Sequence, residues 1–439
     1  DGNFCVDGLV FSDRSLKAGS LEAKAAYQYI EGKLLDSKNG KLQITNLHDF
    51  TNLKEYKLVW ELSVDGQTME EGELICDVEP HKTTELTLDY TLPENCKLGC
   101  YLNLKLYTRK ATVWSDSAYE TAMMQFEIQE VKIIKDTGKD HRDYNDCKAT
   151  EDSHILKISC DGDISYTFNK HLGNLVDIMS GNRSLFVDGT QITAWRAPTD
   201  NDRKIKHKWG LFEDNQSAWN INQLFHKCYN FAWTKEKDGS IVVEVAGSLA
   251  GVARAPFAKY TANYRISKSG KLTINMDVNV NKHCIWLPRF GFEFTLPNSM
   301  ENMEYYGKGP HENYRDLCHH VKVGHYKSRV SDEYVAYIKP QEHGNHTGVK
   351  YLSLYDDKGF GLEFAAETPF ECNASHFTSK ELTETMHNYE LEPSGTTIVR
   401  IDYKGSGIGS NSCGPELLEK YRLNEKSFQF SFDMSPVKK

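Results

Sequence analysis

The chain has 439 residues, of which 39% are hydrophobic and 11% aromatic, and its mean hydropathy is −0.57. Because one hydrophobic core rarely supports so long a chain, we expect two or three domains of a folded, soluble protein. The formal net charge of −10 is spread along the sequence, which argues against nucleic acid as the main partner. Apolar runs stay shorter than the ~18 residues of a membrane span, so no membrane partner is expected.

The eleven cysteines are scattered from Cys5 to Cys413 and match no zinc motif. Only Cys96 and Cys100 lie close together in sequence, and no further Cys or His follows at zinc-site spacing. Reduced thiols in a cytoplasmic protein are the simplest interpretation. The sequence begins at Asp1 without a methionine or an apolar leader, so we expect the natural N-terminus to lie further upstream.

The first domain is predicted from strand patterns that follow a short N-terminal segment. Residues 1–26 contain one strand end and one possible helical turn, too little to bury their own apolar side chains. Over residues 27–134, alternating segments such as 41–46 and 57–64 predict six or seven short strands, and Asp65-Gly66 predicts a hairpin. This pattern indicates an immunoglobulin-like β-sandwich with Trp60 in its core.

Residues 135–150 are polar and charged throughout, which predicts an exposed linker. Beyond it, strand-like segments follow one another to the end of the chain, and one helix is predicted after the capping box at residues 378–381. The predicted strands of this region are 164–169, 240–247, 260–266, 272–280, 290–296, 350–355, 361–366, 399–403 and 427–433. So many antiparallel strands indicate two large stacked sheets.

Three polar segments interrupt these strands, at residues 195–202, 305–316 and 339–347. Each places proline beside carboxylate, amide and Arg or His side chains, and polar loops on a β-scaffold often bind sugars. Their candidate carbohydrate-contacting or domain-shaping residues are Arg196, Asp200, Asn201, Asp202, His311, Glu312, Asn313, Glu342 and His346. Turn formation and ion pairing explain the carboxylates adequately, so we favour a structural role over catalysis.

The three segments together resemble the C-terminal domain of bacterial β-galactosidases of glycoside hydrolase family 2. Residues 405–415 resemble the terminal loop of that domain, and residues 428–434 resemble its last strand. Residues 4–10, followed by Asp13-Arg14, are similar to the segment that leaves the catalytic (β/α)8 barrel. Several separate motifs in the same order make the resemblance specific.

The resemblance implies an all-β fold, an immunoglobulin-like β-sandwich followed by a large galactose-mutarotase-like β supersandwich. The expected divisions are a barrel tail (1–26), the sandwich (27–134), the linker (135–150) and the supersandwich (151–439). The implied parent is a retaining β-galactosidase that hydrolyses terminal β-D-galactosyl residues, with magnesium and sodium as its metals. Both catalytic glutamates would lie on the barrel, so this fragment would be inactive by itself. In the parent it would brace the barrel, aid the formation of a homo-oligomer and line part of the pocket that binds galactose or a β-galactoside.

Three residues are expected to reach the substrate pocket of that parent. Phe4 matches an aromatic residue that lines the galactose pocket, and Asp7 stands where many members have an asparagine near a sodium ion. An Asp7 carboxylate would offer a hard oxygen ligand, although an Asp-Gly turn also explains it. Cys413 occupies the position of a tryptophan that lies under the aglycone sugar in some members. Because cysteine cannot stack on a pyranose, the acceptor subsite is expected to differ.

An alternative is that residues 151–437 form an independent carbohydrate-binding or aldose-mutarotase-like module. Mutarotation requires a general acid and a general base on either side of C1, and Glu342 with His346, or His311 with Glu312, could supply them. This alternative rests on analogy of fold.

Overall fold

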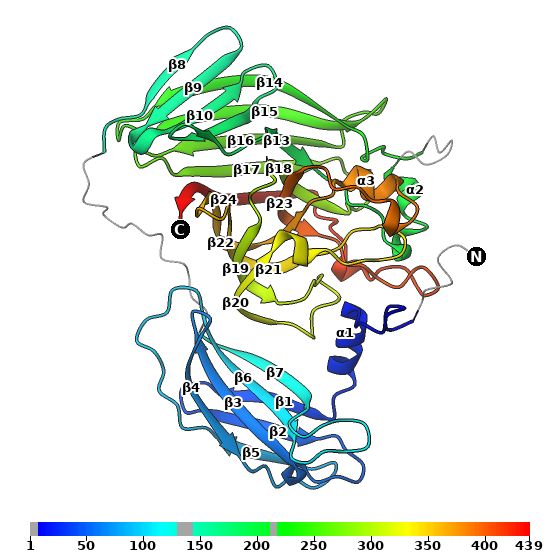
Figure 1. Ribbon diagram of the computed structural model, residues 1–439. Helices are drawn as coiled ribbons and strands as arrows, with labels where there is room; N and C mark the ends of the chain where they lie inside the picture. Colours follow the sequence, from blue (N-terminus) through cyan, green and yellow to red (C-terminus); the bar gives the residue numbers. More distant parts are fainter. Residues whose placement is uncertain (1–7, 130–143, 211–216) are drawn as a thin grey trace.

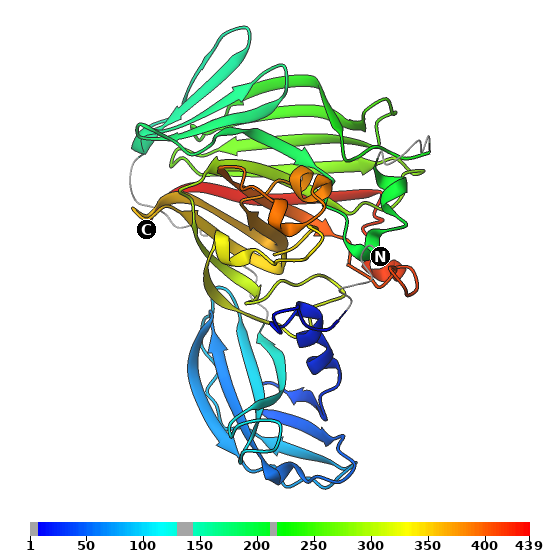
Figure 2. The same ribbon diagram turned by 45° about the vertical axis from the view of Figure 1, so that its right-hand side comes forward.

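The protein consists of two β-rich domains, and the computed structural model describes residues 8–129, 144–210 and 217–439. Helix α1 (Ala18–Ala26) lies between the two domains in both views (Figures 1 and 2). The other α-helices of the described ranges are short: α2 (Lys206–Trp209) and α3 (Ser379–Glu384). The predicted all-β class is therefore confirmed.

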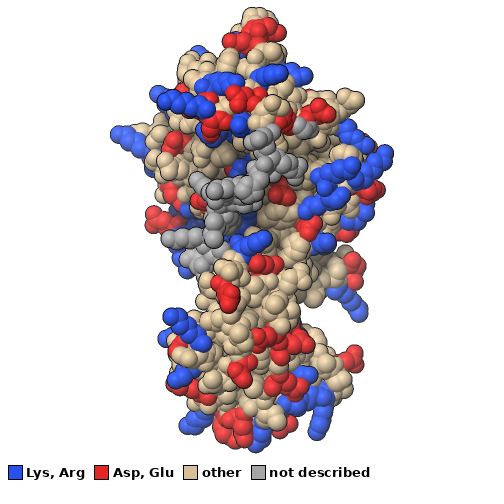
Figure 3. Space-filling model, turned by 90° about the vertical axis from the view of Figure 1, so that its left-hand side faces the viewer, with Lys and Arg blue, Asp and Glu red and all other residues tan. Residues whose placement is uncertain are grey.

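The first domain is a sandwich of two facing antiparallel sheets. One sheet has the order β1 (Ile30–Asp36), β2 (Lys41–Asn46), β5 (Thr83–Thr87), and the other β4 (Gln67–Leu74), β3 (Tyr56–Val64), β6 (Cys100–Thr108), β7 (Glu120–Gln129). Apolar side chains from both sheets fill the space between them, and Trp60 packs in this core as predicted. Acidic and basic side chains alternate over this domain on the face shown in Figure 3, as is typical of a surface that faces water.

The predicted hairpin at Asp65-Gly66 joins β3 to β4. Both residues have positive φ, 52° and 82°, as a two-residue turn of type I′ requires. Gly66 is also where the first domain touches the second, because a Cβ there would lie 2.5 Å from the Cβ of His325. A larger residue at position 66 would therefore strain the turn and the domain contact together.

The second domain contains a small sheet that covers part of a much larger one (Figure 1). The small sheet has the order β12 (Arg183–Ser184), β11 (Asn174–Ser180), β10 (Ile164–Asn169), β9 (Ile155–Cys160), β8 (Lys148–Glu151). The main path of the large sheet runs β13 (Asp188–Thr193), β18 (Arg289–Pro297), β23 (Thr396–Gly405), β22 (Phe360–Ser375), β24 (Ser427–Lys438), β17 (Leu272–Val280), β16 (Ala258–Ile266), β15 (Ile241–Gly251), β14 (Leu224–Lys235). From β22 it branches to β21 (His346–Tyr355), β19 (Asn302–Gly309) and β20 (Lys322–Arg329).

Aromatic side chains hold the two layers together. Phe168 of the small sheet lies 5.3 Å from the ring of Tyr264 and 6.4 Å from that of Phe231, both on the large sheet. Phe292 and Phe432 extend this core beneath the large sheet, with ring centroids 5.5 Å apart. Strand alternation thus places one face of the large sheet in a continuous apolar core.

The structure differs from the sequence prediction in three places. Residues 305–309 were expected in a polar loop but belong to β19, because the Tyr305 and Tyr306 side chains are buried. Cys147 is buried and β8 starts at Lys148, so sheet structure begins within the range assigned to the linker. Residues 135–143 of the expected linker lie outside the described residues. Helix α2 was not anticipated, whereas α3 has the predicted capping box on Thr378.

The domains are joined by contacts at the edge of the large sheet and at α1. Strand β20 pairs only with β19 in the described sheet, and Gln125 of β7 bonds the free edge. Its amide accepts from the Val323 N–H at 2.8 Å and donates to the Val323 carbonyl at 2.9 Å. The side chain of Gln125 therefore acts as a one-residue strand partner across the interface.

We found no helix in the described ranges with the length and apolar character needed to cross a membrane.

Replacing Gln125 by alanine should leave both polar groups of Val323 without protein partners. We expect the Gln125→Ala variant to lose about 1–2 kcal/mol of stability, read as a lower urea midpoint. Gln129→Ala, at an exposed position of the same strand, is the matched control. An unchanged midpoint, or an equal shift in the control, would contradict the role given to Gln125.

Candidate functional site

The terminal loop of the second domain, residues 406–417, is held at its base by side chains from a distant segment. Arg196 donates from Nη1 to the Ser406 carbonyl at 2.6 Å and from Nη2 to the Gly407 carbonyl at 2.9 Å. The same guanidinium forms a bidentate pair with Asp202, at 3.0 and 2.8 Å. Arg196 and Asp202 are both buried, so their charges neutralise one another out of water.

Local sequence explains why Asp202 faces Arg196. Residues 200–202 form a single 3-10 turn that begins after Thr199, and the Asp202 carboxylate accepts from the Thr199 N–H at 3.0 Å. Asp202 thus caps its own turn with one oxygen while it holds the guanidinium. The turn expected from Pro198 and the Asp-Asn-Asp run is therefore present.

Two further side chains fix the middle of the terminal loop. Asn201 donates to the Gly409 carbonyl at 2.7 Å and accepts from the Ser412 N–H at 3.1 Å. Asp316 accepts from the N–H groups of Ile408 and Gly409 at 2.8 and 2.7 Å. With its base and middle anchored in this way, the loop leaves Cys413 exposed at its tip.

A small cavity of about 60 Å³ lies between the terminal loop and residues 201–208. Its walls include Trp286, Asn201, Lys204 and Asn411. An indole beside amide and amine groups is typical of sugar contacts, yet this volume holds only a few water molecules. The cavity is too small for a hexose.

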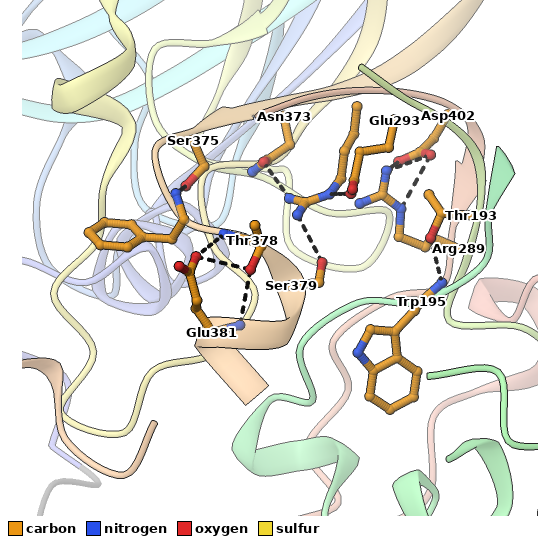
Figure 4. Close-up of polar contacts among 12 residues, drawn as sticks. Thr193, Trp195, Arg289, Glu293, Asn373, Ser375, Thr378, Ser379, Glu381 and Asp402 are labelled. Atoms are coloured by element: carbon orange, nitrogen blue, oxygen red, sulfur yellow. Dashed lines mark hydrogen bonds and ion pairs between the residues drawn. The ribbon is translucent and has the colours of Figure 1, made fainter. Parts of the chain in front are cut away.

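Beneath the loops, the large sheet carries a layer of buried charged residues. On β18, β22 and β23, side chains opposite the apolar core point into this layer (Figure 4). Arg400 bonds Glu293 at 2.8 Å and Asn373 at 2.9 Å, and it reaches Ser379 of α3 at 2.8 Å. Arg289 pairs with Asp402 at 2.6 Å. The sheet is therefore buried on both faces here, apolar on one side and ionic on the other.

Two carboxyl groups in this layer have raised pKa values. Burial raises the pKa of Glu371 to about 7, against hydrogen bonds from the Gly405 N–H and Asn345. Burial also raises the pKa of Asp402 to about 6, although the Arg289 charge opposes it. Glu342 is close enough to Arg196, Arg400 and Asp402 to interact with them electrostatically. The layer thus holds more carboxyl groups than its arginines neutralise.

Several candidate residues prove to be internal connectors. Asn313 is buried and donates to the carbonyls of Lys308 and His311, while its oxygen accepts from the N–H and the hydroxyl of Thr347. The Glu312 carboxylate accepts from Tyr337 at 2.5 Å and from the Gly344 N–H at 2.9 Å. The side chains of Asn313 and Glu312 thus form their hydrogen bonds with other groups of the protein.

Two of the three polar segments, residues 195–202 and 339–347, are also joined directly by hydrogen bonds. The Asp200 N–H donates to the Gln341 side chain at 3.0 Å, and the Glu342 N–H donates to the Ala197 carbonyl at 3.1 Å. The polar segments therefore form one interlocked group with the terminal loop.

In the structure, His346 and Glu312, from the two acid–base pairs of the mutarotase alternative, are bonded to other residues. His346 bonds Glu333 at 2.7 Å rather than Glu342, and its other ring nitrogen faces the Lys308 carbonyl at 3.2 Å. Glu342 has one buried carboxylate oxygen with no partner in the described structure. His311 keeps part of its surface exposed, whereas the neighbouring Glu312 carboxylate is buried and bonded elsewhere.

Two of the predicted pocket residues, Phe4 and Asp7, lie outside the described residues. In the described ranges, no group of three or more His, Cys, Asp or Glu side chains is arranged to hold a metal ion. The ionic layer itself was missed by the sequence prediction. The sequence carries a signal for this layer, the alternation of apolar and charged residues at 289–294, 370–375 and 399–402.

The raised pKa of Glu371 predicts how stability depends on pH. Because the folded state holds this proton more tightly than the ordinary carboxyl value of 4.5, the resulting stability is present below about pH 4.5 and is lost as the pH rises through about 7. We expect Glu371→Gln to gain ~1–3 kcal/mol relative to wild type between pH 5 and 8, measured by urea unfolding. Glu367→Gln, at an exposed position of β22, should show no such gain, and parallel pH profiles for wild type and Glu371→Gln would refute the assignment.

Two protein-family models match this chain in sequence order. The family described as "Beta-galactosidase, domain 4" matches residues 42–129. The family described as "Beta galactosidase small chain" matches residues 161–434, which is more than half of the chain.

Curated relatives named β-galactosidase align with almost the whole chain. The protein of Actinobacillus pleuropneumoniae is 31% identical over 436 residues, 99% of this chain and 41% of that protein. The protein of Staphylococcus xylosus is 30% identical over 443 residues, 100% of this chain and 43% of that protein. The chain thus spans about two fifths of the length of the curated relatives it matches.

Solved structures of aldose epimerases are similar at a low level. The GalM/aldose epimerase homologue from C. elegans gives a TM-score of 0.36 at 9% identity, covering 66% of this chain and 99% of that chain. Galactose 1-epimerase from Lactobacillus acidophilus gives a TM-score of 0.34 at 8% identity, and the match covers 67% of this chain and 98% of that chain. Scores below 0.5 are too low to support a functional argument. On the family matches, the chain belongs to the β-galactosidase family, with its domain 4 and small-chain regions in succession.

Proposed function

We propose that this chain is the C-terminal part of a retaining β-galactosidase that hydrolyses terminal β-D-galactosyl residues of lactose-type substrates. The observation that carries the proposal is the alignment of nearly the whole chain with about two fifths of β-galactosidases. The successive matches to domain 4 and the small chain support the same placement.

In this proposal the chain contributes structure rather than catalytic groups. Retaining hydrolysis requires two carboxyl groups ~5–5.5 Å apart, one of them a nucleophile. Three carboxylates of the polar segments, Asp202, Glu312 and Asp316, are engaged in caps, ion pairs and backbone contacts. In keeping with the family resemblance, we assign both catalytic glutamates to an upstream barrel of the same parent chain.

The terminal loop is proposed to line the acceptor side of the substrate pocket. Its base is anchored by the buried Arg196, while the Cys413 tip faces outward, as suits a loop that meets another domain. Cys413 offers no ring for a sugar to stack on, so acceptor binding is expected to be weak there. Phe4 and Asp7 are proposed to line the galactose side, with Asp7 as a sodium ligand; magnesium is assigned to the barrel.

Contacts with the barrel and with other copies complete the proposal. Leu9 and Leu16, in the segment before α1, are 65% and 60% exposed, and Tyr27 after it is 80% exposed. Apolar side chains so exposed support packing against an upstream domain. A homo-oligomer is proposed from the family. The described cysteines are all free, which supports a reducing, cytoplasmic location.

A complementation assay tests this proposal. The chain alone should hydrolyse nitrophenyl-β-galactoside no faster than buffer, because it lacks the carboxylate pair. Mixed with a separately purified upstream segment of its parent, it should restore activity that neither part shows alone. Hydrolysis by the chain by itself, or full activity of the upstream segment without it, would contradict the proposal.

A further inference from the structure

A second, larger cavity lies at the junction of the two domains and α1, away from the terminal loop. Its volume is about 230 Å³, enough for a small ligand. The polar groups of its wall come from all three parts: Lys24 and Gln28 of α1 and the residues after it, Glu120 and Thr121 of β7, and His311, His319, His320 and Lys322 of the second domain. Cationic and donor groups outnumber the single carboxylate of this wall.

Two of these groups lack a close protein partner. Within the described part of the chain, Lys322 forms no ion pair: its charged neighbour Lys105 is already paired with Glu61 at 2.6 Å, and the Glu61 and Glu120 carboxylates act on Lys322 only beyond ion-pair distance. Burial, followed by the Lys105 charge, lowers the pKa of Lys322 against the charges of Glu61 and Glu120. The His311 imidazole likewise has no hydrogen-bond partner among the described residues, and burial lowers its pKa. A partly buried ammonium with no carboxylate at ion-pair distance is incompletely compensated.

The acidic groups nearby are already engaged. The Glu22 carboxylate receives hydrogen bonds from the rings of His319 and His320, at 2.6 and 2.7 Å, and from both of their backbone N–H groups. These contacts overcome burial and lower the pKa of Glu22 to about 2. Glu120 lies 3.8 Å from Lys24. Neither carboxylate forms an ion pair with Lys322, although the Glu120 charge acts on it from a longer distance.

The wall on the side of α1 also carries an amide donor, Gln28. Gln28 accepts a hydrogen bond from the Met123 N–H through Oε1 at 3.2 Å. This contact fixes the amide so that its N–H₂ group remains available as a donor. Lys24 of α1 also lines the cavity.

We propose that this cavity binds a small tetrahedral oxyanion, an inorganic phosphate or the phosphate group of a small metabolite, between Lys322 and His311 on one wall and Lys24 and Gln28 on the other. Charge-assisted hydrogen bonds from an ammonium group to phosphate are the strong kind, and the anion lowers the cost of the incompletely compensated Lys322 amine. A bound anion joins α1 to the second domain, so it stabilises the folded chain by mass action.

Isothermal titration calorimetry of the whole chain at constant ionic strength tests the proposal. Inorganic phosphate, glucose 6-phosphate, sulfate and chloride are the probes. Saturable binding of phosphate is expected, with a tenfold or greater loss of affinity in Lys322→Gln and a severalfold loss in His311→Gln. Lys259→Gln, an exposed position on β16, is the matched control and should bind as wild type does.

Comparing the probes distinguishes an organic phosphate from the free ion as the ligand, and it also shows when the proposal is wrong. Tighter binding of glucose 6-phosphate than of inorganic phosphate assigns the site to an organic phosphate, and the reverse order assigns it to the free ion. An equal response to chloride, no saturable binding, or unchanged affinity in both cavity variants overturns the proposal. Because Lys322 lies at the start of β20 and His311 lies in the loop after β19, a folding defect in one variant leaves the other to decide.

Discussion

The buried ion pair between Arg196 and Asp202 is the contact on which the arrangement of the polar segments depends. A guanidinium out of water is tolerated only when its charge and its N–H groups are matched, and Asp202 with the carbonyls of Ser406 and Gly407 matches them. Loss of one partner from such a pair costs ~3–5 kcal/mol, because the other charge is left buried. The terminal loop therefore cannot leave Arg196 without a large penalty.

The ionic layer under the loops extends the same constraint across the sheet. Arg400 stands opposite Glu293 on β18 and Asn373 on β22, so its bonds follow from strand register. Its remaining contact, with Ser379, ties α3 to the sheet. A polar sheet face of this kind requires a polar cover, which explains why three segments far apart in sequence converge on it. The need for a polar cover also explains why the amide and carboxylate side chains of these segments form hydrogen bonds within the protein.

Strand patterns in the sequence predicted most of the scaffold. The ranges 41–46, 164–169 and 272–280 coincide with β2, β10 and β17, because each alternates apolar and polar residues over a sheet with one apolar face. Prediction failed where tertiary contacts decide the outcome. Glycines and a proline around Tyr305 suggested a loop, yet burial of two tyrosines extends β19 through it.

The candidate site was predictable in its residue types but not in its partners. Which carboxylate pairs with His346 depends on the position of Glu333, thirteen residues away in sequence and on a separate turn. Proximity in sequence suggested Glu342 instead. The anchoring of the terminal loop by Arg196 spans 210 residues between donor and acceptor, and local patterns carry no information about such a contact.

Amide hydrogen exchange of the terminal loop tests most directly whether Arg196 organises the site. In Arg196→Lys, which keeps the charge but loses the forked geometry, the amides of Ile408, Gly409 and Ser412 should exchange at least ~10-fold faster, while those of β17 stay protected. Arg183→Lys, an exposed arginine, should exchange as wild type does. Unchanged protection of the terminal loop in Arg196→Lys, or an equal loss throughout β17, would contradict the account.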